Sequence, residues 1–225
     1  MTENKSSLIN FKLFILLFLA LILIFSVDSI YATGDTIYVN DTGGNDDNDG
    51  SDWNTAKKTI KNATGSVNVN GIINIANGQY NGTNNTQITI DKNMTINGES
   101  QTGTIINGTG TNWIFHVNPG ITFKLNNLTI TNANRDYGAG IYNSGNFTVS
   151  GSTISGNTAL EGGGGIYNYV CYVTVSGSTI SGNTANAGGG IYNYDGILTV
   201  SGSSICGNTA NAGGGIYNYD GILTV

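Results

Sequence analysis

The strongest constraint on the fold of this chain is an internal repeat with a period of 25 residues. The motif GIYN recurs with its isoleucine at four positions, Ile141, Ile166, Ile191 and Ile216, and residues 183–200 are identical to residues 208–225. A repeat of this length is typical of solenoids, because one unit cannot bury its own apolar side chains and therefore stacks on its neighbours. The chain is expected to fold as a stack of similar coils.

Each repeat contains three short apolar segments separated by Gly and Asn, which favour turns. Leu198 and Val200 alternate with Thr199, the period of a half-buried strand, and Ile191 and Ile205 supply the inward side chains of the other two segments. Strands of successive coils would pair in parallel about 4.8 Å apart, with the right-handed connection that parallel strands prefer. The sequence predicts an all-β fold, a right-handed single-stranded parallel β-helix (solenoid) over residues 33–225. Its regular repeats occupy residues 138–225, with looser coils before them.

Polar residues also recur with the repeat. Asn157, Asn183 and Asn208 occupy equivalent positions, and we expect their amides to hydrogen-bond from coil to coil. Cys171 and Cys206 belong to no metal-binding motif. We expect free thiols there, with a disulfide as the alternative.

One segment before the repeats has the period of a helix. In residues 52–63, Trp53, Ala56, Ile60 and Ala63 fall on one helical face, and Asp52 or Ser51 could cap the N-terminus. We predict a short helix here that covers the open end of the first coil, as the capping units of solenoids do. The residues that follow it provide about six to seven coils.

The N-terminus predicts export. Residues 13–27 form an apolar run of the length found in signal peptides, and Ala32 offers a cleavage position. We predict a signal peptide at 1–32, with an uncleaved anchor as the alternative, and no membrane-spanning helix in the mature chain. The expected location is secreted, at the cell surface or in the cell envelope.

The charge distribution argues against binding to nucleic acid. The net charge is −6, and no Lys or Arg follows Arg135. Binding to a phosphate backbone needs clustered cations. Nucleic acid is therefore excluded as an expected partner.

The ionisable residues of the repeats do not form a pattern typical of catalysis. Glu161, Asp195 and Asp220 are the only charged residues of 137–225, and the two aspartates repeat with the coils, which indicates a structural turn. A glycosidase needs carboxylates that converge on one bond, and a lyase needs a basic group near the sugar. His116 is the single histidine, and alternation leaves open whether it points inward or outward. We predict no catalytic residue and no metal ligand, so the chain is not expected to be an enzyme.

Residues 45–52 (NDDNDGSD) are rich in Asp. An EF-hand alignment would place Ala56 where the bidentate Glu must stand, so that motif fails. We expect a solvated turn and no cofactor, and a looser Ca²⁺ site is the alternative.

The tyrosines of the repeats are the candidate ligand-binding residues. If the GIYN isoleucines point inward, the tyrosines that follow them point outward in one row, and a second row lies two residues further on. The two rows are Tyr142, Tyr167, Tyr192 and Tyr217, and Tyr169, Tyr194 and Tyr219. Such rows stabilise parallel coils as aromatic ladders, and they can also form a platform for surface carbohydrate or protein ligands.

The paired motifs GAGI or GGGI and IxGN resemble the repeat of the polymorphic outer membrane proteins. They stand at 138–141, 163–166, 188–191 and 213–216, and at 154–157, 180–183 and 205–208. The opening TIYVND and the segment 45–60 are similar to those of adhesin-like surface proteins of methanogenic archaea. The resemblance covers most of residues 35–225 and implies a parallel β-helix with an adhesin-like role, at the outer membrane in the first family.

Together these observations predict an exported, adhesin-like structural and binding protein without catalytic activity. The alternative is a β-helix enzyme, a lyase or glycosidase, that acts on polysaccharides. The sequence stops at Val225 within a strand segment. We therefore expect a truncated array whose open edge pairs end to end with other copies.

Overall fold

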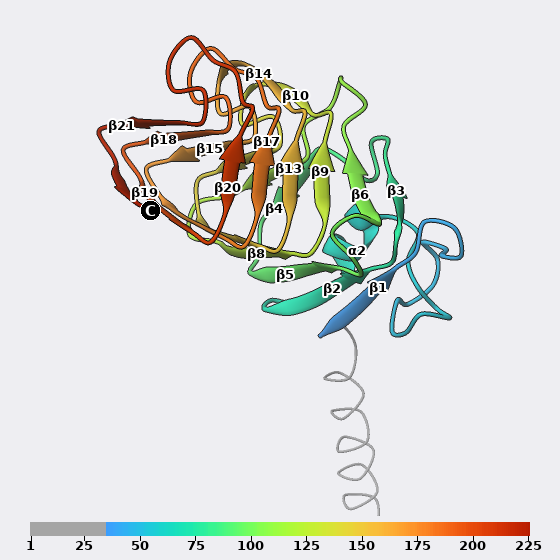
Figure 1. Ribbon diagram of the computed structural model, residues 1–225. Helices are drawn as coiled ribbons and strands as arrows, with labels where there is room; N and C mark the ends of the chain where they lie inside the picture. The colour runs from blue at the N-terminus through green and yellow to red at the C-terminus, as the bar shows by residue number, and fades with distance from the viewer. Residues whose placement is uncertain (1–34) are drawn as a thin grey trace, which may run out of the picture. The chain divides into compact units, whose positions relative to one another are not determined.

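The three apolar segments of each repeat form three parallel β-sheets that follow the axis of the solenoid (Figure 1). The computed structural model describes residues 35–225, so the signal peptide predicted at 1–32 lies outside the described residues. One helix accompanies the strands of this range. The predicted all-β parallel β-helix is confirmed, and it has about six coils.

Each complete coil contributes one strand to each sheet, and β1 and β22 extend sheet 1 at its two ends. Sheet 1 consists of β1 (Thr36–Val39), β2 (Gly71–Ile75), β5 (Met94–Gly98), β8 (Thr122–Asn126), β12 (Asn146–Ser150), β16 (Tyr172–Ser176), β19 (Ile197–Ser201) and β22 (Ile222–Thr224). Sheet 2 consists of β4 (Ile88–Ile90), β7 (Phe115–Val117), β11 (Ile141–Asn143), β15 (Ile166–Tyr169), β18 (Ile191–Tyr194) and β21 (Ile216–Tyr219). Sheet 3 consists of β3 (Gly78–Tyr80), β6 (Thr104–Asn107), β9 (Thr129–Thr131), β13 (Thr153–Ser155), β17 (Thr179–Ser181) and β20 (Ser204–Cys206).

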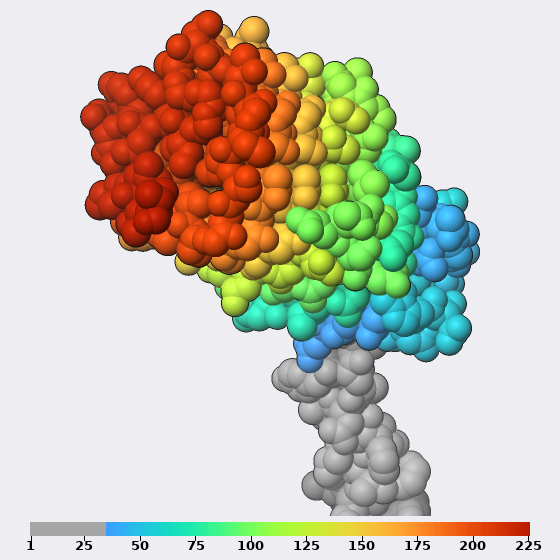
Figure 2. Space-filling model, in the orientation of Figure 1, coloured from blue at the N-terminus to red at the C-terminus, as the bar shows by residue number. Residues whose placement is uncertain are grey.

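The register places equivalent residues of successive repeats side by side. Ile166 pairs with Ile141 on one side and with Ile191 on the other, and all three are fully buried. Val175 and Ile180 supply the buried side chains of the other two sheets in the same coil. Burial of such a side chain is worth roughly 1.5–3 kcal/mol, so the stacked aliphatic columns are the main stabilising feature of the fold. Figure 2 shows the coils as successive bands of colour along the molecule.

Asparagine side chains close hydrogen bonds between coils. Asn157 Nδ2 donates to Asn183 Oδ1 at 2.9 Å, and Asn183 Nδ2 donates to Asn208 Oδ1 at 3.0 Å, which confirms the predicted ladder. A second ladder, which we did not predict, joins the asparagines of the GIYN motifs. Its members are Asn143, Asn168, Asn193 and Asn218, with amide-to-amide distances of 2.8, 2.7 and 2.6 Å. Both ladders satisfy buried polar groups where the chain turns from one sheet to the next.

The predicted helix at 52–63 is wrong in its extent. The helix is α2 (Ile60–Ser66), and its N-cap is Thr59, whose hydroxyl accepts from the backbone N–H of Asn62, so neither Asp52 nor Ser51 caps it. Lys57 instead pairs in parallel with Val39 of β1, and this extended backbone cannot also be helical. Trp53 is accordingly 46% exposed.

The segment before α2 folds as a series of turns, and the helix still covers the first coil. The Asp52 carboxylate accepts from the backbone N–H groups of Asn54 and Thr55, which holds the chain in a turn. Ile60 and Ala63 are buried in the core against the first strands. The predicted covering role of the helix is therefore confirmed.

A short lateral sheet joins sheet 3 to sheet 2, and we did not predict it. It begins with β10 (Asn134–Tyr137) and β14 (Thr158–Gly162), which pair in parallel. In the next two coils it continues through single bridges: Thr158 to Thr184, Thr184 to Thr209, Gly162 to Ala187 and Ala187 to Ala212. We call this structure the side wall. In Figure 1 it lies where β10 and β14 are labelled.

Three further expectations concern the described residues 35–225. Among these residues, no helix has both the length and the apolar composition that a membrane span requires.

Cys171 and Cys206 are free thiols, as expected, and Cys206 occupies the position of Ser181 in the coil before. Ile222 of the last coil is 60% exposed. End-to-end association through this coil stays a prediction.

Candidate ligand-binding groove

The register of sheet 2 places one outward side chain of each coil in a single column. Tyr142, Tyr167, Tyr192 and Tyr217 follow one another, and His116 precedes Tyr142. The isoleucines that precede the first three tyrosines, Ile141, Ile166 and Ile191, are buried in the core. The predicted outward row is therefore confirmed. His116 belongs to this outward face, which resolves the alternation that the sequence left open.

The rings of this first row are close together but not parallel throughout. Ring centroids lie 5.2 Å apart between Tyr142 and Tyr167, 5.1 Å between Tyr167 and Tyr192, and 5.0 Å between Tyr192 and Tyr217. The first pair is stacked, whereas Tyr192 is inclined by 75° and 79° to its two neighbours. Edge-to-face contacts of this kind are favourable, and they prevent successive rings from covering each other's faces.

The second row is a conventional stacked ladder. Tyr169, Tyr194 and Tyr219 have centroids 5.5 and 5.4 Å apart and interplanar angles of 15° and 11°. Because each ring covers the face of the next, this row presents ring edges and hydroxyl groups to solvent. Tyr169 and Tyr219 are each 44% exposed. The predicted stabilising ladder describes this row better than the first.

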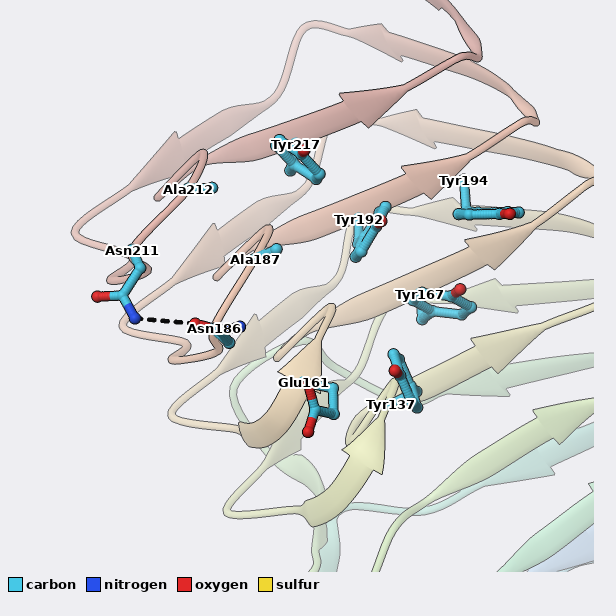
Figure 3. A pocket seen from close by; sticks show the side chains of 10 residues that line it. All are labelled: Tyr137, Glu161, Tyr167, Asn186, Ala187, Tyr192, Tyr194, Asn211, Ala212 and Tyr217. Carbon is cyan, nitrogen blue, oxygen red and sulfur yellow. Dashed lines mark hydrogen bonds between the residues drawn. The ribbon is translucent and has the colours of Figure 1, made fainter.

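The side wall and the first row enclose a groove of about 430 Å³ (Figure 3). Its lining residues come from four successive coils: Tyr137, Glu161, Tyr167, Asn186, Ala187, Tyr192, Tyr194, Asn211, Ala212 and Tyr217. The tyrosines of sheet 2 form one side of the groove, and the side wall forms the other.

The side wall leaves room for the groove because its residues are small. Tyr137, Gly162, Ala187 and Ala212 occupy equivalent positions in successive coils. Tyr137 fills this position in the first of these coils, and its ring contacts Tyr167 with centroids 5.1 Å apart. Gly162 leaves room only for the Tyr192 ring, which lies directly against it, and Ala187 and Ala212 in the next two coils leave the space of the groove open. The groove is therefore closed by Tyr137 at one end and runs along the solenoid axis from there.

The rim of the groove is polar. Glu161, Asn186 and Asn211 each precede one of the small wall residues. Asn211 Nδ2 donates to Asn186 Oδ1 at 2.8 Å, the dashed line of Figure 3. Glu161 is the only carboxylate among the lining residues. Burial raises the pKa of Tyr192, and the nearby Tyr217 raises it further, so this phenol stays neutral at physiological pH.

A single cation, Arg135, lies among aromatic rings beside the closed end of the groove. The Arg135 guanidinium stands 4.6 Å from the ring centre of Trp113 and 5.4 Å from that of Tyr142, in cation–π geometry. Arg135 Nη1 is buried, and it is the only buried side-chain nitrogen or oxygen of residues 35–225 without a hydrogen bond. Burial lowers the pKa of His116, and the positive charge of Arg135 lowers it further. His116 is therefore neutral at physiological pH.

The first row is more covered than the sequence suggested. Tyr167 is only 7% exposed, because Tyr137, Tyr142 and Tyr192 surround its ring. Outward position in a strand therefore does not make this residue freely accessible. Sequence reasoning missed the side wall that covers it. The signal that could have indicated the wall is the recurrence of Gly162, Ala187 and Ala212 with the period of the tyrosines.

The acidic residues of residues 35–225 do not converge on one site. No three His, Cys, Asp or Glu side chains in this range lie close enough together to hold a metal ion. In the Asp-rich loop, Asp46 accepts from the backbone N–H groups of Lys58 and Thr59 and from the Thr59 hydroxyl. Its carboxylate thus ties the loop to the start of α2. Asp195 and Asp220 lie on exposed turns with φ of 48° and 54°.

Comparison of the chain with protein-family models, with curated proteins and with solved structures gives no significant match. Function is therefore inferred from the geometry of the groove.

Proposed function

We propose that this chain is an exported, adhesin-like protein of the cell surface that binds its ligand in the tyrosine groove and catalyses no reaction. The observation that carries the proposal is the groove itself, which tyrosines from successive coils line on one side. Tyrosine supplies a large, rigid surface with a polar end, and it is enriched in binding interfaces for that reason. The groove and the apolar run at 13–27 support binding outside the cytoplasm.

The groups in the groove favour binding over catalysis. Hydrolysis of a glycosidic bond requires two carboxyl groups on either side of that bond. Glu161 stands alone among the lining residues, and the others are tyrosine, asparagine and alanine. The His116 and Arg135 cluster adjoins only the closed end, where Tyr137 blocks the groove. A polysaccharide-acting enzyme therefore has less support than a binding protein.

A turnover assay separates these two functions. The purified chain would be incubated with neutral and acidic polysaccharides, with and without Ca²⁺. We expect no unsaturated product and no new reducing ends. Either product, formed at a rate that scales with protein concentration, would contradict a role without catalysis.

An adhesion assay tests the groove directly. We expect beads coated with the chain to adhere to intact cells, and the combined substitution of Tyr167, Tyr192 and Tyr217 by Ser to abolish adhesion. Tyr172→Ser is the matched control, because Tyr172 is an exposed tyrosine of sheet 1 outside the groove. Equal adhesion of all three proteins would show that the groove is not the binding site.

Export has its own test. We expect the chain recovered outside the cytoplasm to begin at Thr33, as mass spectrometry of its N-terminal peptide would show. Recovery of the full-length chain in the cytoplasmic fraction alone would contradict export.

A further inference from the structure

We infer that the groove binds an uncharged, extended glycan chain that lies parallel to the solenoid axis, with one sugar unit per coil. This inference rests on the proposed function and specifies its ligand. Three properties of the groove carry it: the spacing of the tyrosines, the absence of basic groups and the small residues of the side wall.

The spacing of the tyrosines selects the kind of polymer. The rings of Tyr167, Tyr192 and Tyr217 repeat every 5.1 and 5.0 Å. The ring-to-ring spacing of an extended hexose chain is close to this value, so successive sugars can keep step with successive coils. An extended peptide presents side chains to one face about every 6.6 Å, since it rises about 3.3 Å per residue. A peptide along the axis would therefore lose register within two coils.

The chemistry of the lining suits sugar rings. A hexose presents C–H groups on its faces and hydroxyl groups around its edge. Tyr192 and Tyr217 offer ring surface for the faces, because their mutual inclination of 79° prevents them from stacking on each other. Asn186 and Asn211 offer amide donors and acceptors for the hydroxyls. Their mutual hydrogen bond uses one side-chain atom of each residue and leaves the other available.

The charge of this part of the molecule excludes acidic glycans. Residues 136–225 contain four acidic residues, Asp136, Glu161, Asp195 and Asp220, and no Lys or Arg. Glu161 stands at the rim itself and would repel a uronate or a sulfate. An uncharged chain experiences no such repulsion.

The side wall limits where the glycan can lie. Ala187 and Ala212 leave space opposite the tyrosines, whereas Tyr137 fills the equivalent position at the closed end. Sugars can therefore occupy the coils of Tyr192 and Tyr217, which provide room for about two units, whereas Tyr167 is covered by Tyr137 and its neighbours.

The test is isothermal titration calorimetry of the chain with uncharged β-1,4-linked glucose oligomers, from disaccharide to hexasaccharide, after a screen on an array of uncharged linear glycans. Where the array identifies another uncharged glycan, its own oligomers replace the glucose series. Affinity is expected to rise about two- to tenfold with each sugar, as aromatic contacts of this strength would give, and to level off once about two or three sugars are bound. Oligogalacturonate of equal length is expected not to bind.

Ala187→Tyr is the diagnostic variant. It places in the second coil of the groove the side chain that Tyr137 carries at the equivalent position, so the wall accommodates it while the groove is filled. We expect hexasaccharide binding to fall at least tenfold with an unchanged melting temperature. Tyr172→Ser is expected to bind as the unmodified chain does.

The outcomes distinguish this inference from the proposed function. If no uncharged glycan binds but the tyrosine substitutions abolish adhesion, the groove binds a protein instead and the glycan inference is wrong. If oligogalacturonate binds equally well, or affinity does not depend on length, the inference is also overturned. If the tyrosine substitutions leave adhesion intact, the proposed function is wrong, and the glycan inference that rests on it is overturned as well.

Discussion

Gly162 lies directly against the ring of Tyr192, so that a Cβ atom built on this glycine would collide with Tyr192 Cδ1. The side wall can therefore approach the tyrosine row only because this position lacks a side chain. The contact couples the shape of the groove to a single residue of the wall.

The first prediction concerns this contact. Gly162→Ala is expected to displace the Tyr192 ring and to lower the free energy of unfolding by about 1–3 kcal/mol, as overpacking does. Gly65→Ala is the control, because a Cβ at Gly65 in α2 meets nothing within 4 Å. That substitution is expected to stabilise by about 0.5–1 kcal/mol. Urea denaturation measures both, and equal effects would contradict the close contact.

A second prediction concerns the asparagine ladder. Asn183 is fully buried; its Oδ1 accepts from the backbone and side chain of Asn157, and its Nδ2 donates to Ile154 O and Asn208 Oδ1. Asn183→Ala would leave these groups unsatisfied and is expected to cost about 3 kcal/mol. Asn211→Ala removes only the exposed hydrogen bond from Asn211 to Asn186 and should change stability by less than about 0.5 kcal/mol. Similar costs for both variants would refute the ladder as a stabilising element.

Val170 provides a third prediction. It has a φ of 58°, a left-handed conformation that is costly for a β-branched residue, and it occupies the turn position held by Asp195 in the next repeat. Since Asp tolerates this conformation better, Val170→Asp is expected to stabilise the chain by about 1 kcal/mol. The reverse change, Asp195→Val, should destabilise it by a similar amount. Thermal unfolding of the pair decides the matter, and a loss of stability in Val170→Asp would contradict the conformational argument.

The fourth prediction uses the single histidine of the chain. Burial lowers the pKa of His116 from its ordinary value of 6.5, and the charge of Arg135 adds to this effect. Arg135→Met removes the charge but keeps most of the volume, so the pKa of His116 is expected to rise while staying below 6.5, since burial is the larger cause. Proton NMR reports the titration of one imidazole. An unchanged pKa would show that Arg135 does not lie beside His116.

The stack, the register and the tyrosine column could be predicted from the sequence because a strict period fixes all three at once. If one coil closes in 25 residues, then Tyr167 must neighbour Tyr192, and Asn183 must neighbour Asn208. The ladder of Asn168 and Asn193 follows from the same period, and the GIYN motif contained the signal for it.

The side wall and the limits of α2 could not be predicted in the same way. Periodicity states which residues are equivalent, but it does not state how far a glycine-rich connection folds back over a neighbouring sheet. The helical period of residues 52–63 was real, yet the tertiary pairing of Lys57 with β1 prevailed over the local preference. The burial of Tyr167 depends on the wall, so the accessible part of the groove required the structure.

The proposed ligand site lies over the tyrosines of sheet 2. The most direct measurement is an NMR titration of the chain, labelled with ¹³C in its tyrosine rings, with the longest uncharged oligosaccharide that binds. We predict that the resonances of Tyr192 and Tyr217 shift on titration, whereas those of Tyr38 and Tyr172, which lie on sheet 1, do not. Resonance shifts confined to tyrosines outside the groove would contradict this binding site. Saturable binding that shifts no tyrosine resonance would contradict it too.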